Sequence, residues 1–172
     1  MNRFRRTLLA FGILALILGI VGWGFYKKNY PYGSTHRCSK VLAMELRSFA
    51  EENGGKFPAS ENRDALGLST LLEKSPHFLD LVVGKAGDLD KARQFYEKNG
   101  YLLPAHSSWN YVEGLTSNDY GALAWDKIPL GHYGQKQSSN SREVIMTDGM
   151  VRYIPEKDWN EFLAHSTKAA RE

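Results

Sequence analysis

The first pattern in the chain is an uninterrupted apolar run near its N-terminus. Residues Leu8–Tyr26 include no charged and no amide side chain. As a helix this run is about 28 Å long, which matches the hydrocarbon core of a bilayer. It is bordered by basic residues on both sides and by aromatic residues near its end: Arg3, Arg5, Arg6, Lys27 and Lys28, and Trp23, Phe25 and Tyr26. The pattern predicts one transmembrane helix over residues 7–28.

A cleaved signal peptide is the alternative interpretation of this run. Signal peptides have shorter apolar regions and end in a small-X-small cleavage site, whereas this run ends in Trp-Gly-Phe-Tyr-Lys-Lys. An uncleaved signal-anchor helix is therefore favoured. The basic tail at residues 1–6 is expected to stay in the cytoplasm. Residues 29–35 then form a linker, and residues 36–172 form a domain outside the inner (cytoplasmic) membrane. Ala15 and Gly19 make one small-xxx-small pair, which is suited to a helix–helix contact.

Beyond the linker, the apolar residues recur at helical spacing in short segments. Cys38, Leu42, Leu46 and Phe49 fall on one face of a predicted helix over residues 37–53, which the Asn53-Gly54-Gly55 sequence ends. The same reasoning predicts two shorter helices, at Leu66–Leu72 and Asp88–Asn99. The apolar run His77–Val83 suits either a helix or a strand, and the end of a short helix is favoured.

After Pro104 the pattern becomes typical of strands. Short strands are predicted at Trp109–Val112, Ala122–Trp125, Arg142–Thr147 and Met150–Ile154, with a polar loop at Gln135–Ser141. Asp148-Gly149 predicts a tight hairpin turn of type I′ between the last two. A closing helix is expected to begin at Pro155 and to bury Trp159, Phe162 and Leu163. Helices followed by antiparallel strands, without strand–helix–strand alternation, indicate an α+β fold.

The overall positive charge of the chain comes from the residues that flank the apolar run. The net charge is +3 for the whole chain, and five basic residues lie within the first 28 residues, so the remainder has a net charge of −2. A nucleic-acid-binding domain carries its basic excess on the folded part, so this function is not expected. The single cysteine, Cys38, excludes an intrachain disulfide.

Two groups of motifs resemble a known family. The segment from Cys38 to Pro58, with its Asn-Gly-Gly-Lys-Phe-Pro ending, is similar to the helix and following corner of type II secretion pseudopilin-like proteins. The segments Trp109–Thr116, Leu123–Asp126, His132–Gly134 and Val144–Val151 resemble the C-terminal region of prepilin-type H-X9-DG proteins. Here fifteen residues, rather than nine, separate His132 from Asp148. The apolar run contains no glutamate, so no recognisable prepilin cleavage site is present.

One histidine and three aspartates near the predicted strands are candidate metal ligands. His132 and Asp148 are the most specific candidate pair, for a hydrogen bond or a shared metal ion. Asp119, Asp126 and Asp148 can supply oxygen ligands to Ca²⁺, which some pseudopilins are known to bind. No Asp-X-Asp spacing concentrates these ligands. The simpler interpretation is preferred: Asp148 and Gly149 are structural turn residues, and no cofactor is required.

The remaining candidates for catalytic or ligand-binding residues are not supported by their spacing. Cys38 and His36 point to different sides of a helix, so a nucleophile–base pair is not expected. The five histidines have no zinc-binding spacing, and no phosphate loop or nucleophile elbow occurs, so the chain is not expected to be an enzyme. An aromatic set is more typical of a core than of a sugar-binding face: Trp109, Tyr111, Trp125, Tyr133 and Tyr153.

The sequence therefore predicts a non-enzymatic, membrane-anchored, pseudopilin-like protein. The resemblance implies a component or accessory of a type II secretion or pilus-like assembly in a bacterial envelope, with the membrane and other pilin-like proteins as partners. The alternative is an anchored binding module that recognises a glycan or peptide through the aromatic strands.

Overall fold

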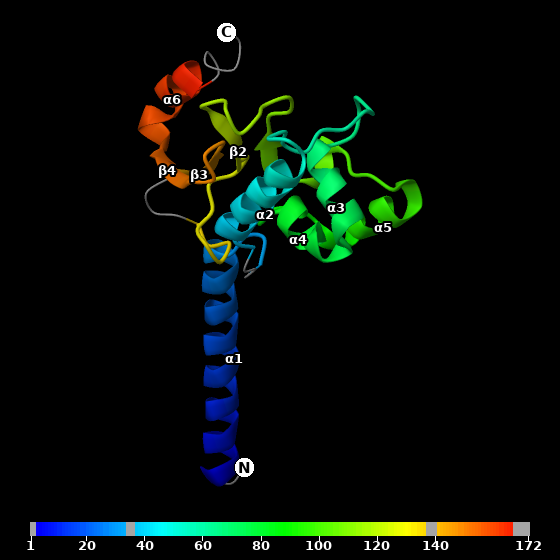
Figure 1. Cartoon of the computed structure of the whole chain (residues 1–172). Helices are drawn as coiled ribbons and strands as arrows, with labels where there is room; N and C mark the ends of the chain where they lie inside the picture. The colour runs from blue at the N-terminus through cyan, green and yellow to red at the C-terminus, as the bar shows by residue number, and fades with distance from the viewer. Residues whose placement is uncertain (1–2, 34–36, 137–140, 167–172) are drawn as a thin grey trace.

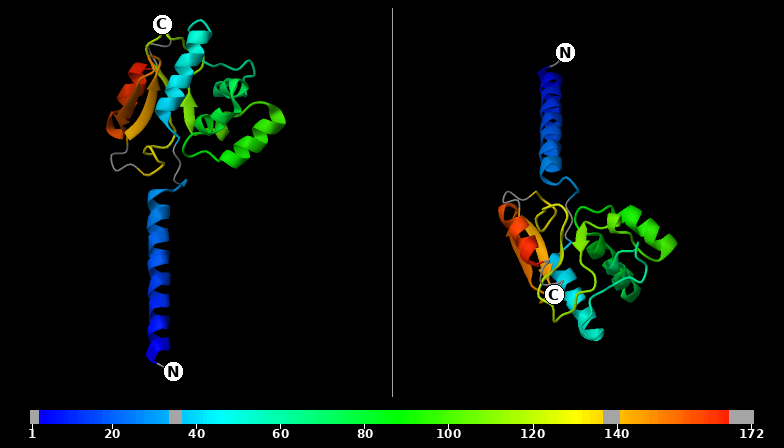
Figure 2. Two further views of the ribbon diagram at one scale, coloured as in Figure 1. Left: turned by 60° about the horizontal axis from the view of Figure 1, so that its bottom comes forward. Right: turned by 90° about the horizontal axis from the view of Figure 1, so that it is seen from above.

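The N-terminal helix stands apart from the rest of the molecule. The computed structural model describes residues 3–33, 37–136 and 141–166 (Figure 1). Helix α1 (Arg3–Asn29) projects from the folded part in every view (Figures 1 and 2), and its side chains from residue 11 to residue 28 are exposed. Among the described residues it is the one helix long and apolar enough to cross a membrane.

A turn follows the end of α1. Pro31 cannot continue a helix, and Gly33 has a φ of +84°, so the chain turns within Tyr30–Gly33. Helix α2 (Ser39–Glu52) follows, two residues later than the predicted start. Leu42 and Leu46 are buried, as their spacing predicts. The helix ends at Asn53, and Gly54 and Gly55 both have positive φ.

Short helices fill the next fifty residues. Two segments each consist of a 3₁₀ turn followed by one turn of α-helix: η1 (Gly67–Ser69) with α3 (Thr70–Lys74), and η2 (Pro76–Phe78) with α4 (Leu79–Val83). Helix α5 (Leu89–Asn99) begins where the Asp88 carboxylate accepts a hydrogen bond from the Lys91 amide at 3.2 Å. It ends at Gly100, which has a φ of +76°. A further 3₁₀ turn, η3 (Pro104–His106), leads into the strands.

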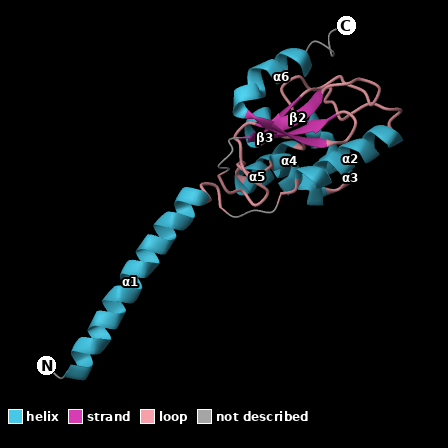
Figure 3. Cartoon of the chain, turned by 90° about the vertical axis from the view of Figure 1, so that its left-hand side faces the viewer, coloured by secondary structure: helices cyan, strands magenta, loops and turns pink. Residues whose placement is uncertain are grey.

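The strands form one antiparallel sheet in chain order. Its members are β1 (Trp109–Tyr111), β2 (Ala122–Asp126), β3 (Ser141–Met146) and β4 (Val151–Pro155). Helices α2 to α5 lie on one face and α6 (Trp159–Ser166) on the other (Figure 3). The α+β prediction is confirmed.

Each face of the sheet has its own hydrophobic core. The larger core packs Leu42 and Leu46 of α2 and the short helices against Trp109, Ala124 and Ile145. The smaller core packs Trp159 of α6 against Val144 and Met146. Successive strand residues point to opposite faces, so Val144 and Ile145 belong to different cores.

Two local predictions at the end of the chain need correction. Gly149 N–H donates to Met146 O at 3.0 Å, and Met146 N–H donates to Met150 O at 2.9 Å. Thr147 and Asp148 therefore occupy the central turn positions and Gly149 follows with a φ of +80°, which makes a three-residue loop rather than the predicted two-residue type I′ turn. The closing helix also begins later than Pro155, which ends β4. A 3₁₀ turn, η4 (Glu156–Asp158), precedes α6.

The backbone conformation of Gly149 leads to a testable prediction. Gly149→Ala is expected to reduce the free energy of unfolding by about 1–2 kcal/mol, because an L-residue is disfavoured at this positive φ. Met150→Ala, which changes an exposed neighbour, is the matched control. Urea unfolding of the full chain in detergent measures both variants, and equal stability of the two would contradict the assigned turn.

Candidate functional site

A buried ionic cluster lies between the α4–α5 loop and the sheet. Lys85 is in the loop, directly after Gly84, whose φ is +73°. Asp126 is the last residue of β2, and Glu143 is in β3. Because Trp125 pairs with Val144 in the antiparallel register, Asp126 and Glu143 are neighbours on adjacent strands. The three side chains are 1%, 2% and 0% exposed respectively.

The lysine ammonium group is shared among three acceptors. Lys85 Nζ lies 2.7 Å from Glu143 Oε2 and 3.8 Å from Asp126 Oδ2. It also donates to Leu130 O, in the β2–β3 loop, at 3.4 Å. Within the described part of the chain, Asp126 Oδ2 and both carboxylate oxygens of Glu143 have no hydrogen bond of regular geometry, although Lys85 and Tyr153 lie close to Glu143. Buried polar atoms are normally satisfied, so these three oxygens mark the cluster as unusual.

The electrostatics of the cluster follow from its burial. Two carboxyl groups face one ammonium group, so full ionisation would leave a negative charge in a dry interior. Burial raises the pKa of Asp126 to about 7, against the opposing effect of Lys85, and the negative charge of Glu143 raises it further. Tyr153, which pairs with Glu143 across β3 and β4, has a pKa raised first by partial burial and then by the charge of Glu143.

Arg37 holds the same loop from the other side. Its guanidinium group is 7% exposed and donates to the carbonyl oxygens of Gly84 and Gly87. Burial lowers the pKa of Arg37, and the nearby Asp80 opposes that shift. The α4–α5 loop is thus tied by Arg37 to the start of α2 and by Lys85 to the sheet. The adjoining β2–β3 loop contacts the end of α1, where Lys136 N–H donates to Asn29 O at 2.8 Å.

Sequence reasoning singled out Asp126 but missed its two partners. Lys85 interrupts the apolar and small residues of Val82–Gly87, which is an unusual position for a solvated lysine. Strand alternation places Glu143 on the same face as Ile145, and so toward the larger core. The sequence therefore contains both indications of burial, but only the fold shows that Lys85 and Glu143 lie next to Asp126.

The other predicted site residues are not brought together. His132 lies in the β2–β3 loop with its ring against Tyr133, at 4.9 Å between centroids. Asp148 accepts from Met150 N–H at 2.8 Å in the β3–β4 turn. Asp119 accepts two bonds from Thr116, and these lower its pKa. No group of three or more His, Cys, Asp or Glu residues that could hold a metal ion occurs in the described ranges. The proposed Ca²⁺ ligands therefore have separate structural surroundings.

The remaining sequence candidates are distributed as follows. His36 lies outside the described residues, and Cys38 is half-buried at the start of α2. Trp109 and Tyr111 belong to the larger core, and Trp125 packs on the α6 side. Tyr133 and Tyr153 belong to neither core and are 53% and 50% exposed, so the expectation of a core position is wrong for these two.

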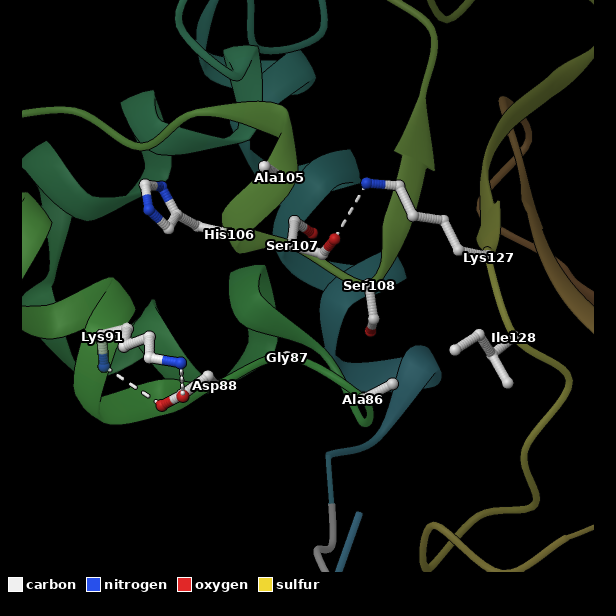
Figure 4. A pocket seen from close by; sticks show the side chains of 10 residues that line it. All are labelled: Ala86, Gly87, Asp88, Lys91, Ala105, His106, Ser107, Ser108, Lys127 and Ile128. Atoms are coloured by element: carbon white, nitrogen blue, oxygen red, sulfur yellow. Dashed lines mark hydrogen bonds and ion pairs between the residues drawn. The ribbon is translucent and has the colours of Figure 1, made fainter. Parts of the chain in front are cut away.

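A cavity of about 340 Å³ opens beside the Lys85 loop (Figure 4). It lies between Gly87 and the start of α5 on one side and residues 105–108 with Lys127 on the other. Its cationic groups already have partners. Lys91 pairs with Asp88 at 3.1 Å, and Lys127 donates to Pro104 O and Ser107 O at 2.7 and 2.9 Å. Burial lowers the pKa of Lys127. The cavity therefore lacks a free charged group aimed at a ligand among these residues.

Comparison with known proteins gives no family assignment. No protein-family model, no curated protein and no solved structure matches the chain.

Proposed function

We propose that this protein is a single-pass, membrane-anchored envelope protein that acts by binding other proteins, as a non-enzymatic component or accessory of a type II secretion or pilus-like assembly. The observation that carries the proposal is the exposed apolar helix α1, which precedes an α+β domain. A chain of this form places a folded domain at a bilayer surface. The three arginines of the N-terminal tail favour a cytoplasmic N-terminus and an outer domain beyond the membrane.

The packing of α2 supports the resemblance to pseudopilins. This helix follows the membrane helix, lies across an antiparallel sheet and ends at the Asn-Gly-Gly corner on which the resemblance rests. Its outer side keeps Val41 and Met44 exposed, at 39% and 69%. Exposed apolar side chains on a helix next to the membrane suit contacts with neighbouring subunits.

The alternative role, recognition of a glycan or peptide through the aromatic strands, has less support. Trp109 and Tyr111 belong to the larger core and Trp125 to the smaller one, and Tyr153 of β4 is 50% exposed. The proposed assembly role therefore remains the preferred function.

Photo-cross-linking in intact envelopes tests this proposal. A photoreactive residue at Met44 of a tagged full-length chain should capture pilin-like or secretion-machine proteins, identified by mass spectrometry. The same residue at Glu97, exposed on the outer side of α5, is the matched control. Recovery of the chain alone from both positions, with its N-terminus intact, would overturn the assembly role.

A further inference from the structure

The buried cluster places an amine within 4 Å of both a carboxyl group and a potential proton carrier, away from bulk solvent. Lys85, Asp126 and Glu143 are each at least 98% buried. Their placement is not explained by stability alone, because a buried ion pair contributes little over an apolar replacement. Three carboxylate oxygens of the cluster have no hydrogen bond of regular geometry, which is also unfavourable for stability.

We propose that this cluster is a site of spontaneous covalent modification, in which Lys85 Nζ and the side-chain carboxyl carbon of Asp126 join as an amide while Glu143 carries the proton. This inference concerns the outer domain itself and does not depend on the proposed function.

The step is balanced and needs no co-reactant. The ammonium group of Lys85 first gives a proton to Glu143, whose Oε2 is 2.7 Å away. The lone pair of the neutral amine then attacks the carboxyl carbon of Asp126. A C–N bond forms, the C–OH bond of the acid breaks, and Glu143 transfers a proton to the departing hydroxyl group. One water leaves, the Asp126 carboxyl group becomes a secondary amide, and Glu143 takes the last proton from the amine nitrogen and ends as the neutral carboxylic acid.

The environment favours each part of this step. The amine becomes nucleophilic after one proton transfer, over the 2.7 Å that separate Lys85 Nζ from Glu143 Oε2. The raised pKa of Asp126 keeps a substantial fraction of this residue as the carboxylic acid, which carries a leaving hydroxyl group. Reacting groups held in one site have effective concentrations of about 10⁵–10⁸ M. Exclusion of bulk water opposes the reverse hydrolysis.

Geometry also assigns the two acids to different roles. Glu143 is the closer acceptor, at 2.7 Å against 3.8 Å for Asp126, and is therefore placed to receive the proton. Asp126 Oδ2 has no hydrogen-bond donor among the described residues and lies 3.8 Å from Lys85 Nζ, so this carboxyl group is the nearer candidate for attack once Glu143 holds the proton.

The bond would fasten the α4–α5 loop to the end of β2. It would close a loop over residues 86–125, next to the point where Arg37 binds the carbonyl groups of Gly84 and Gly87. With one cysteine, the chain has no intrachain disulfide for this purpose. A covalent link of this kind restricts the unfolded chain in the same way as a disulfide.

Mass spectrometry of the full-length chain, purified in detergent, tests the proposal directly. The intact protein should be lighter than its sequence mass by one water. Trypsin should fail to cleave after Lys85, and should release one branched peptide that joins residues 75–91 to residues 99–127. An unmodified mass, together with cleavage after Lys85, would overturn the proposal. A branch from Lys85 to Glu143 would overturn the assignment of Asp126.

Variants separate the roles of the three residues. Lys85→Arg and Asp126→Ala should restore the full mass, and Lys91→Arg, an exposed lysine in the neighbouring cavity, should keep the loss of water. Glu143→Gln keeps the shape of the side chain but removes the proton acceptor, so the cross-linked fraction should fall at least tenfold. A Glu143→Gln protein that folds, by circular dichroism, and is fully cross-linked would overturn the role of Glu143. The wild-type peptide map does not depend on whether any variant folds.

Discussion

Lys85→Met is expected to destabilise the outer domain by about 3–5 kcal/mol, because it leaves two buried carboxyl groups without their cation. The side chain of Lys85 is 1% exposed, and its ammonium group is the shared partner of Glu143, Asp126 and the Leu130 carbonyl oxygen. Loss of a covalent link through Lys85 would act in the same direction. Urea unfolding of the full chain in detergent, followed by circular dichroism, measures the effect.

Two further variants show whether the cause is the buried charge. Lys91→Met removes an ion pair whose lysine is 80% exposed, so it should change stability by less than about 1 kcal/mol. The triple variant K85M/D126L/E143L removes the whole cluster and should recover at least half of the loss, because apolar replacement of a buried ionic group is often neutral. A Lys85→Met protein as stable as the Lys91→Met protein would show that the cluster is not buried as described.

The pair of changes Leu16→Asp and Ile20→Asp is expected to release the chain from membranes. Both side chains are exposed near the middle of α1, at 65% and 64%. Each aspartate at the centre of a membrane helix costs about 2.5–3.5 kcal/mol of insertion free energy, so together they oppose insertion by roughly 5–7 kcal/mol. The fraction of the chain that stays with membranes after alkaline carbonate extraction measures the effect.

Two control variants accompany this test. One changes the same positions of α1 without adding charge, and the other adds a charge outside α1. Leu16→Ala with Ile20→Ala shortens the same two side chains without adding charge, and Met44→Asp adds charge on the exposed side of α2. Both should remain in the membrane fraction. Carbonate-resistant Leu16→Asp/Ile20→Asp protein would contradict a membrane-spanning role for α1. Wild-type protein that lacks residues before Trp23 and is soluble would instead establish a cleaved signal peptide.

Local patterns predicted most of the secondary structure because short-range interactions determine it. The helical spacing of Leu42 and Leu46 places them in the core, and Asp88 and Gly100 mark the ends of α5. The errors occur where tertiary or neighbouring contacts choose between similar local options. A three-residue loop and a type I′ turn both suit Asp-Gly, and the observed hydrogen bonds between Met146, Gly149 and Met150 distinguish them.

The candidate site was less predictable for a physical reason. Lys85, Asp126 and Glu143 lie in a loop and two strands, separated by up to 58 positions in the sequence. Their contacts depend on the strand register, and a shift of one residue would turn Glu143 to the opposite face. Asp126 was selected as a possible metal ligand because the sequence shows its charge but not the ammonium group that lies beside it.

By itself, the sequence determined that the chain has an apolar helix long enough for a bilayer and an α+β domain of short helices and antiparallel strands. Those features depend on composition, periodicity and turn residues, which act over a few neighbouring positions. Only the tertiary structure placed a lysine and two acids in one buried site, put His132 in the β2–β3 loop and Asp148 in the β3–β4 turn, and divided Trp109 and Trp125 between two cores. These arrangements arise from packing between distant segments, where burial changes the energy and the protonation of each charged group.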